Sequence, residues 1–135
     1  MEPVVRNVEL LKDGVAALNR RDIDGMLAVL HEDVRLEPLR AVHDGIFYQG
    51  HEGLKAWLAD MAEDWEHQSV ELRDVQALSS GQALVDAVLH VRYRGSGVEV
   101  AAPGAWLCEF RDGLVSRIRF YSDVESAVAA AGEHS

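Results

Sequence analysis

The stretch from Gly104 to Asp123 constrains the fold more than any other part of the chain, because its pattern is that of a β-hairpin. Two runs rich in β-branched and aromatic residues flank Asp112-Gly113, a pair that is typical of tight turns. A loop of three residues, Arg111 to Gly113, and a loop of two residues differ by one position in register and send different side chains to each face. We expect the three-residue loop, because it separates the apolar side chains from the charged ones.

The expected register gives the hairpin one apolar face and one mixed face, with Trp106 opposite Ile118. The apolar face carries Trp106, Cys108, Phe110, Leu114, Ser116, Ile118 and Phe120. The mixed face carries Leu107, Glu109, Val115, Arg117, Arg119 and Tyr121, with opposite charges near each other. The apolar face should cover a concave interior with few polar atoms. The hairpin therefore predicts an apolar pocket.

Three helices are expected ahead of the strands. The first runs from Pro3 to about Asn19, where apolar residues recur every three or four positions, and Asp22 caps a shorter second helix. A strand over Val34 to Glu37 ends at Pro38. The third helix, Glu52 to Glu66, has one apolar face, formed by Leu54, Trp57, Leu58, Met61, Ala62 and Trp65.

Strands dominate the second half of the chain. Val70 to Leu78 and Leu84 to Arg94 have strand patterns, another strand begins at Val98, and the hairpin follows. A short C-terminal helix is expected after Ser122. Because the helices precede the strands, the order indicates an α+β fold with three N-terminal helices packed on a strongly curved, mostly antiparallel sheet. At 135 residues, we expect a single domain over residues 1–135.

The composition excludes several classes of partner. The 13 basic and 23 acidic side chains give a net charge of -10, which would repel the phosphates of a nucleic acid and the surface of an anionic membrane. Cys108 is the only cysteine, so no internal disulfide can form. The first residues lack the pattern of a signal peptide. We therefore expect a cytoplasmic protein that binds neither nucleic acid nor membrane.

Three local patterns carry a resemblance to a known family. They are Tyr48-Gln49-Gly50-His51-Glu52-Gly53, Gly95-Ser96-Gly97-Val98-Glu99-Val100, and Arg111-Asp112-Gly113 followed by Tyr121-Ser122-Asp123. Together with the order of elements, they resemble the SnoaL-like (polyketide cyclase type) branch of the nuclear transport factor two-like superfamily. The resemblance implies one SnoaL-like domain shaped as a conical half-barrel with a deep cavity, usually a homodimer. Members of this superfamily include isomerases, cyclases, dehydratases and hydrolases.

The resemblance also implies a general base. In ketosteroid isomerase relatives an acidic residue before a proline, at the end of the first strand, removes the proton, and Leu36-Glu37-Pro38 is similar to that step. An apolar cavity would raise the pKa of Glu37 and suit it to this role. The alternative is a solvated glutamate paired with Arg35 or Arg40. Phe120, where some cyclases carry an acid, and a first helix without tyrosine favour a non-catalytic ligand-binding or dimerisation module.

The segment from Leu39 to Gly50 has no clear period and is expected to form the rim of the pocket. There, His43 could donate a catalytic proton and Tyr48 could form a hydrogen bond to a ligand. The alternative, which the position on a loop favours, is that both are ordinary surface residues. The expected ligand is a small apolar or partly polar molecule, and its binding residues are Tyr48, Trp57, Met61, Trp106 and Phe120.

Two further hypotheses concern histidines and the sheet surface. Asp86 and His90 share one face of a strand and could form a proton-transfer dyad, although the apolar residues at alternate positions favour placing both on the outer surface. The six histidines lack the spacing of metal ligands, so no metal site and no cofactor are expected.

The expected fold also predicts a homodimer. Helices on the concave side of the sheet would leave its outer face bare, with Leu107 and Val115 exposed there, and a second copy of the chain would cover them.

Overall fold

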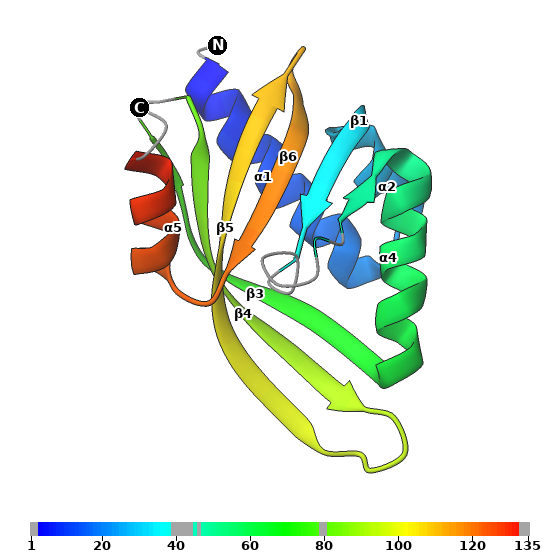
Figure 1. Cartoon of the computed structure of the whole chain (residues 1–135). Coiled ribbons are helices and arrows are strands. Elements are labelled where there is room, and N and C mark those ends of the chain that lie inside the picture. The colour runs from blue at the N-terminus through cyan, green and yellow to red at the C-terminus, as the bar shows by residue number, and fades with distance from the viewer. Residues whose placement is uncertain (1–2, 39–44, 46, 79–80, 133–135) are drawn as a thin grey trace.

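One mixed sheet of six strands organises the molecule (Figure 1). The computed structural model describes residues 3–38, 45, 47–78 and 81–132. The elements in chain order are α1 Pro3–Arg20, α2 Ile23–Val29, β1 Leu30–Glu37, β2 Tyr48–Gln49, α4 Gly50–Asp64, β3 Trp65–Ala77, β4 Ala83–Tyr93, β5 Glu99–Arg111, β6 Leu114–Tyr121 and α5 Val124–Gly132.

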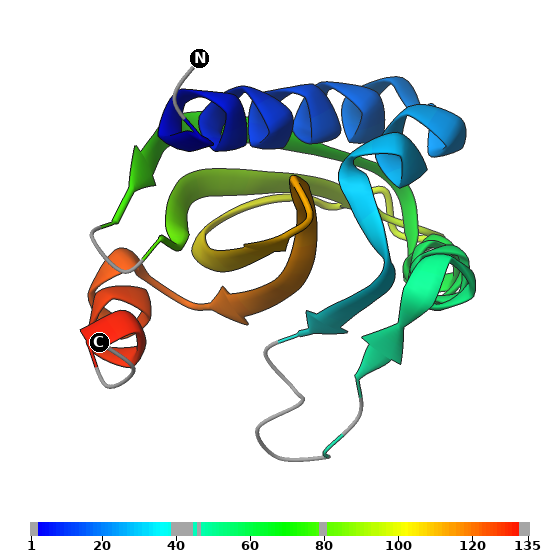
Figure 2. The same ribbon diagram turned by 90° about the horizontal axis from the view of Figure 1, so that it is seen from above.

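The strand order is β2-β1-β6-β5-β4-β3. Every neighbouring pair is antiparallel except β1 and β6, which run parallel. The sheet curves strongly without closing, and α1 lies across it, so the molecule is an open cone (Figure 2). The α+β fold with N-terminal helices, a curved and mostly antiparallel sheet and a short C-terminal helix is therefore confirmed.

Side chains at the helix ends fix how the helices meet the sheet. The carboxylate of Asp22 accepts a hydrogen bond from the Gly25 amide at 3.0 Å and so begins α2, as the sequence predicts. At the end of α1, the Asn19 side chain donates to the Val70 carbonyl at 2.8 Å and accepts from the Val70 amide at 2.7 Å. These two bonds tie α1 to β3. No helix in the described part of the chain has the length and apolar content needed to cross a bilayer.

The sheet separates two apolar clusters of unequal size. The larger lies between the sheet and α1, α2 and α4, and includes Val85 and Cys108. The smaller lies on the opposite face, where Leu84 and Ala105 pack against Ala127 of α5. Leu84 and Val85 belong to different clusters because neighbouring side chains on a strand point to opposite faces. Both faces of β4 are thus covered at its first residues within one chain.

The hairpin between β5 and β6 forms, but its expected register is wrong. Arg111 pairs with Leu114, so the loop is the two residues Asp112-Gly113, both with positive φ. A bulge then shifts the pairing, and Trp106 lies opposite Phe120 instead of Ile118. Beyond the bulge, the observed pairing differs from the expected pairing by two positions along β6. Side chains two positions apart on a strand point to the same face, so Trp106, Ile118 and Phe120 still lie on the inner face.

The bare outer face expected for Leu107 and Val115 is also wrong. Leu107 is 0% exposed and pairs with Leu84 on the face that α5 covers. Val115 is 1% exposed and belongs to the larger cluster on the inner face, because the bulge changes its direction. The chain itself therefore covers both residues.

Candidate ligand-binding site

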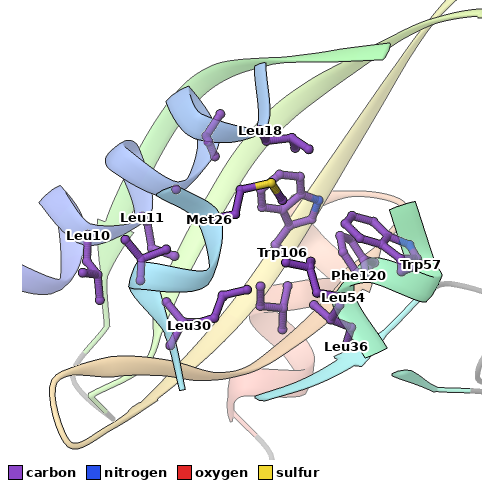
Figure 3. A pocket seen from close by; sticks show the side chains of 15 residues that line it. Leu10, Leu11, Leu18, Met26, Leu30, Leu36, Leu54, Trp57, Trp106 and Phe120 are labelled. Carbon is purple, nitrogen blue, oxygen red and sulfur yellow. The ribbon is translucent and has the colours of Figure 1, made fainter. Parts of the chain in front are cut away.

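An apolar cavity lies between the helices and the inner face of the sheet (Figure 3). Its volume is about 60 Å³. The residues that line it are Leu10, Leu11, Gly14, Val15, Leu18, Met26, Val29, Leu30, Leu36, Leu54, Trp57, Trp106, Val115, Ile118 and Phe120. None of these side chains carries an ionisable group, so the described residues of the wall offer packing but no proton transfer.

Three aromatic rings form one wall of this cavity. Trp57 comes from α4, Trp106 from β5 and Phe120 from β6 (Figure 3). The centroid of the Phe120 ring is 5.6 Å from that of Trp106, nearly edge to face, and 5.7 Å from that of Trp57. Such ring geometries are favourable. The structure therefore brings together three of the five residues that we expected to bind a ligand.

Glu37 lies on the opposite face of β1 from the cavity. Its neighbour Leu36 lines the cavity, and the alternation of the strand sends the carboxylate of Glu37 to the outer face. There, Arg117 donates to both oxygens, at 2.5 Å and 3.1 Å, and Arg35 lies 3.1 Å away. Arg117 also contacts Glu109 at 3.3 Å. The carboxylate is thus part of an ion-pair network.

This network lowers the pKa of Glu37, contrary to the expectation of a raised pKa. Burial opposes the charge, but the hydrogen bond and charge of Arg117, with the charges of Arg35 and Arg119, outweigh it. A carboxylate with a lowered pKa is a weaker base. Because the pKa is lower in the folded state, the pair stabilises the protein above the pKa of the unfolded state, and this stabilisation is lost as the pH falls through the folded pKa.

The remaining expected site residues lie elsewhere. Tyr48 and Met61 line a surface groove of about 310 Å³ beside α4, which shares Trp57 with the cavity. The Tyr48 hydroxyl donates to Asp60 Oδ2 at 2.6 Å. His43 lies outside the described residues. The groove and the cavity are therefore neighbours, with Trp57 in contact with both.

Asp86 and His90 both lie on the outer surface of the sheet. They occupy the same face of β4 as Leu84, whereas Val85 and Ala87 face the larger cluster. The nearest acidic partner of His90 is Glu71, whose Oε1 is 3.0 Å from its Nε2. The position on the outer surface is the one that the sequence pattern favours.

Sequence reasoning missed most of the helical residues around the cavity. Leu10, Leu11 and Leu18 of α1 line it together with Met26 of α2. The apolar period of these helices signals that they pack on the sheet, but it does not tell which side chains border a cavity.

Cys108 is buried on the inner face of the sheet, as its place on the apolar face of the hairpin predicts. Burial raises the pKa of its thiol to about 12, so the side chain acts as a small apolar residue.

Comparisons with solved structures agree with this fold. TerC crystallised with polyporic acid aligns with a TM-score of 0.78 and 22% identity, over 95% of this chain and 96% of TerC. A proposed polyketide cyclase from Xanthomonas campestris pv. campestris has a TM-score of 0.73 and 25% identity, over 95% of this chain and 98% of its own. A Mycobacterium tuberculosis protein in complex with estradiol-17beta-hemisuccinate has a TM-score of 0.74 and 21% identity, over 93% and 97%.

The sequence comparison assigns the family. No curated protein matches the chain at a significant level. Residues 11–118, which span α1 to β6, match the SnoaL-like domain. This region includes Trp57 and Trp106 and most of the sheet around them, and Phe120 lies just beyond it. The chain belongs to the SnoaL-like domain family.

Proposed function

We propose that the protein binds a small, mostly apolar molecule in the cavity between its helices and its sheet. The observation that carries this proposal is the cavity itself, whose lining side chains in the described part of the chain are all apolar and include three aromatic rings. Ligand sites in proteins are commonly concave and lined by such residues. Two structural neighbours were crystallised with small organic molecules, TerC with polyporic acid and the Mycobacterium tuberculosis protein with estradiol-17beta-hemisuccinate, which supports a small organic ligand here.

The cavity must expand to hold such a molecule. Its volume of about 60 Å³ is well below the range of roughly 300 to 1,000 Å³ that is typical of ligand pockets. Three side chains that line the cavity also line a surface groove, so a change in their conformation would enlarge the cavity toward that groove. Leu18 and Met26 line a groove of about 260 Å³, and Trp57 lines the groove of about 310 Å³. Met26 has a flexible side chain that adapts readily to a new shape. Opening at Met26 or Trp57 would join the cavity to a groove.

A neutral apolar probe tests this proposal. We expect 1-octanol to produce a saturable change in tryptophan emission, because Trp57 and Trp106 both face the cavity. Val15→Phe should weaken this binding at least tenfold by filling the cavity, and Val128→Phe is the matched control, since Val128 is 49% exposed on α5. Circular dichroism would show that both variants are folded. Octanol binding that Val15→Phe leaves unchanged would place the ligand elsewhere and refute the proposal.

The second candidate is an isomerase, cyclase or hydrolase in which Glu37 is the general base. The sequence step Leu36-Glu37-Pro38 supports it, whereas the ion pair with Arg117 favours the alternative, a module that binds without catalysis. For an enzyme of this kind, ligand binding would have to release Glu37 from Arg117. His43 remains a proposed proton donor for the same reaction.

Glu37→Gln separates these two roles. In an enzyme, the change should abolish turnover of any substrate found while leaving ligand affinity nearly unchanged. If Glu37 only pairs with Arg117, the variant should be less stable than the wild type at pH 7, and the difference should shrink as the pH falls through the lowered pKa of Glu37. Thermal unfolding across this pH range measures the second effect. Equal stability of both proteins at every pH would contradict the structural role.

We also propose a homodimer and a cytoplasmic location, the arrangement and compartment expected from the sequence. The dimer cannot use Leu107 and Val115 as its apolar contacts, because both are buried within the chain. Cys108 is the only cysteine, so the fold uses no internal disulfide, which supports a reducing compartment. Sedimentation at micromolar concentration tests the dimer.

A further inference from the structure

The groove beside α4 combines features that are absent from the cavity. It has a volume of about 310 Å³ and runs along α4 to the first residue of β3. Its lining includes the indoles of Trp57 and Trp65, the phenol of Tyr48, and the carboxylates of Asp60 and Asp64. Trp57 also lines the cavity (Figure 3). The groove thus contains acidic and aromatic side chains, and Trp57 separates it from the apolar cavity.

The two carboxylates are placed where a cation would relieve their repulsion. Asp60 and Asp64 are four residues apart and lie on the same face of α4, a spacing at which like charges destabilise a helix. Asp64 is the last residue of α4, where the helix dipole is negative, and Asp60 lies one turn before it. The guanidinium of Arg94 binds the carbonyl oxygens of Ala62 and Trp65 at this end, and it is not among the lining residues of the groove.

The aromatic side chains add a second attraction for a cation. The faces of indole rings bind ammonium groups, and Trp is the most effective side chain in this role. Tyr48 is 9% exposed, and its hydroxyl holds Asp60 Oδ2 at 2.6 Å. A carboxylate has room for several hydrogen bonds, so Asp60 can accept one from Tyr48 and another from an ammonium group. The groove therefore brings two carboxylates and two indole rings together around one space.

We infer that this groove binds the ammonium head of an amphiphilic organic cation, whose apolar tail passes Trp57 into the cavity. The inference rests on the proposed function, because the tail needs the cavity. The net charge of -10 also attracts cations to the whole molecule. The other groove that borders the cavity has Arg21 and no carboxylate among its described lining residues, so it does not suit the same head group.

Three probes of equal chain length test the inference, namely octylammonium chloride, 1-octanol and sodium octanoate, measured by titration calorimetry at pH 7. The wild type should bind octylammonium about tenfold more tightly than 1-octanol, and octanoate least. Asp60→Asn and Asp64→Asn should each lower the affinity for octylammonium about fivefold, the size expected for an exposed ion pair, and leave 1-octanol unaffected. Asp64→Asn does not touch the hydrogen bond of Tyr48.

Glu63→Gln is the matched control, because Glu63 is an exposed acid of α4 that does not line the groove. It should bind all three probes as the wild type does. If it lowers octylammonium affinity as much as Asp64→Asn, the attraction comes from the general charge and the inference is wrong. Equal affinity of the wild type for octylammonium and 1-octanol overturns the inference but leaves the proposed cavity intact. Binding of none of the probes overturns both.

Discussion

Replacing Leu107 with alanine should lower the free energy of unfolding by about 2 to 5 kcal/mol, the usual cost of truncating a fully buried leucine. Leu107 is 0% exposed in the single chain, on the face of the sheet that α5 covers. Chemical denaturation of the wild type and the variant measures this cost. Val128→Ala on α5 is the control, because Val128 is 49% exposed and should change stability by less than about 0.5 kcal/mol.

The same experiment distinguishes burial within the chain from burial between two copies. If α5 covers Leu107, the loss of stability should not depend on protein concentration. A loss that grows as the protein is diluted would instead place Leu107 at a dimer interface. It would contradict the packing of α5 on the sheet.

Replacing Trp106 with alanine should lower the free energy of unfolding by about 3 kcal/mol, near the lower end of the range for buried aromatic residues. The lower end is expected because Trp106 already borders a cavity and is only partly buried. The truncation should enlarge this cavity by the space of an indole ring. Free indole should therefore bind the variant and restore about 1.4 kcal/mol at ten times its dissociation constant.

Trp65→Ala is the matched control for this rescue. Trp65 lines the two surface grooves and not the cavity, so added indole should not restore its stability. Thermal unfolding with and without indole measures both variants. A cost near zero for Trp106→Ala, or equal effects of indole on the two variants, would show that Trp106 does not wall a closed apolar space.

The helices and the inner position of the aromatic residues could be predicted because they depend on local periods. Trp57 lies on the apolar side of a helix with a 3.6-residue period, and Trp106 lies on a strand with a two-residue period. The register of the hairpin could not be predicted in the same way. A three-residue loop, and a two-residue loop followed by a bulge, send Trp106 and Phe120 to the same face. The residues near the turn tell them apart, because Val115 faces the cavity and Ser116 lies on the outer face, the reverse of the expected register.

The surroundings of Glu37 depend on contacts between residues far apart in the sequence. The pattern of β1 predicts that Leu36 and Glu37 face opposite ways, but the sequence does not say which one faces the cavity. The parallel pairing of β1 with β6 decides this, because it places Glu37 beside Arg117 and Arg119, some eighty residues later. The groove was missed for a similar reason. Asp60 and Asp64 have helical spacing, but their role depends on Tyr48 and Trp65, which belong to other elements.

The hydrogen bonds of Asn19 affect how the protein avoids aggregation. β3 is the last strand of the sheet, and the exposed amides and carbonyls of such a strand can recruit a strand from another molecule. The carboxamide of Asn19 occupies both the amide and the carbonyl of Val70, as a neighbouring strand would. At this position α1 replaces the missing strand with one side chain. A helix that covers the cavity thus also closes this point of the open sheet to other molecules.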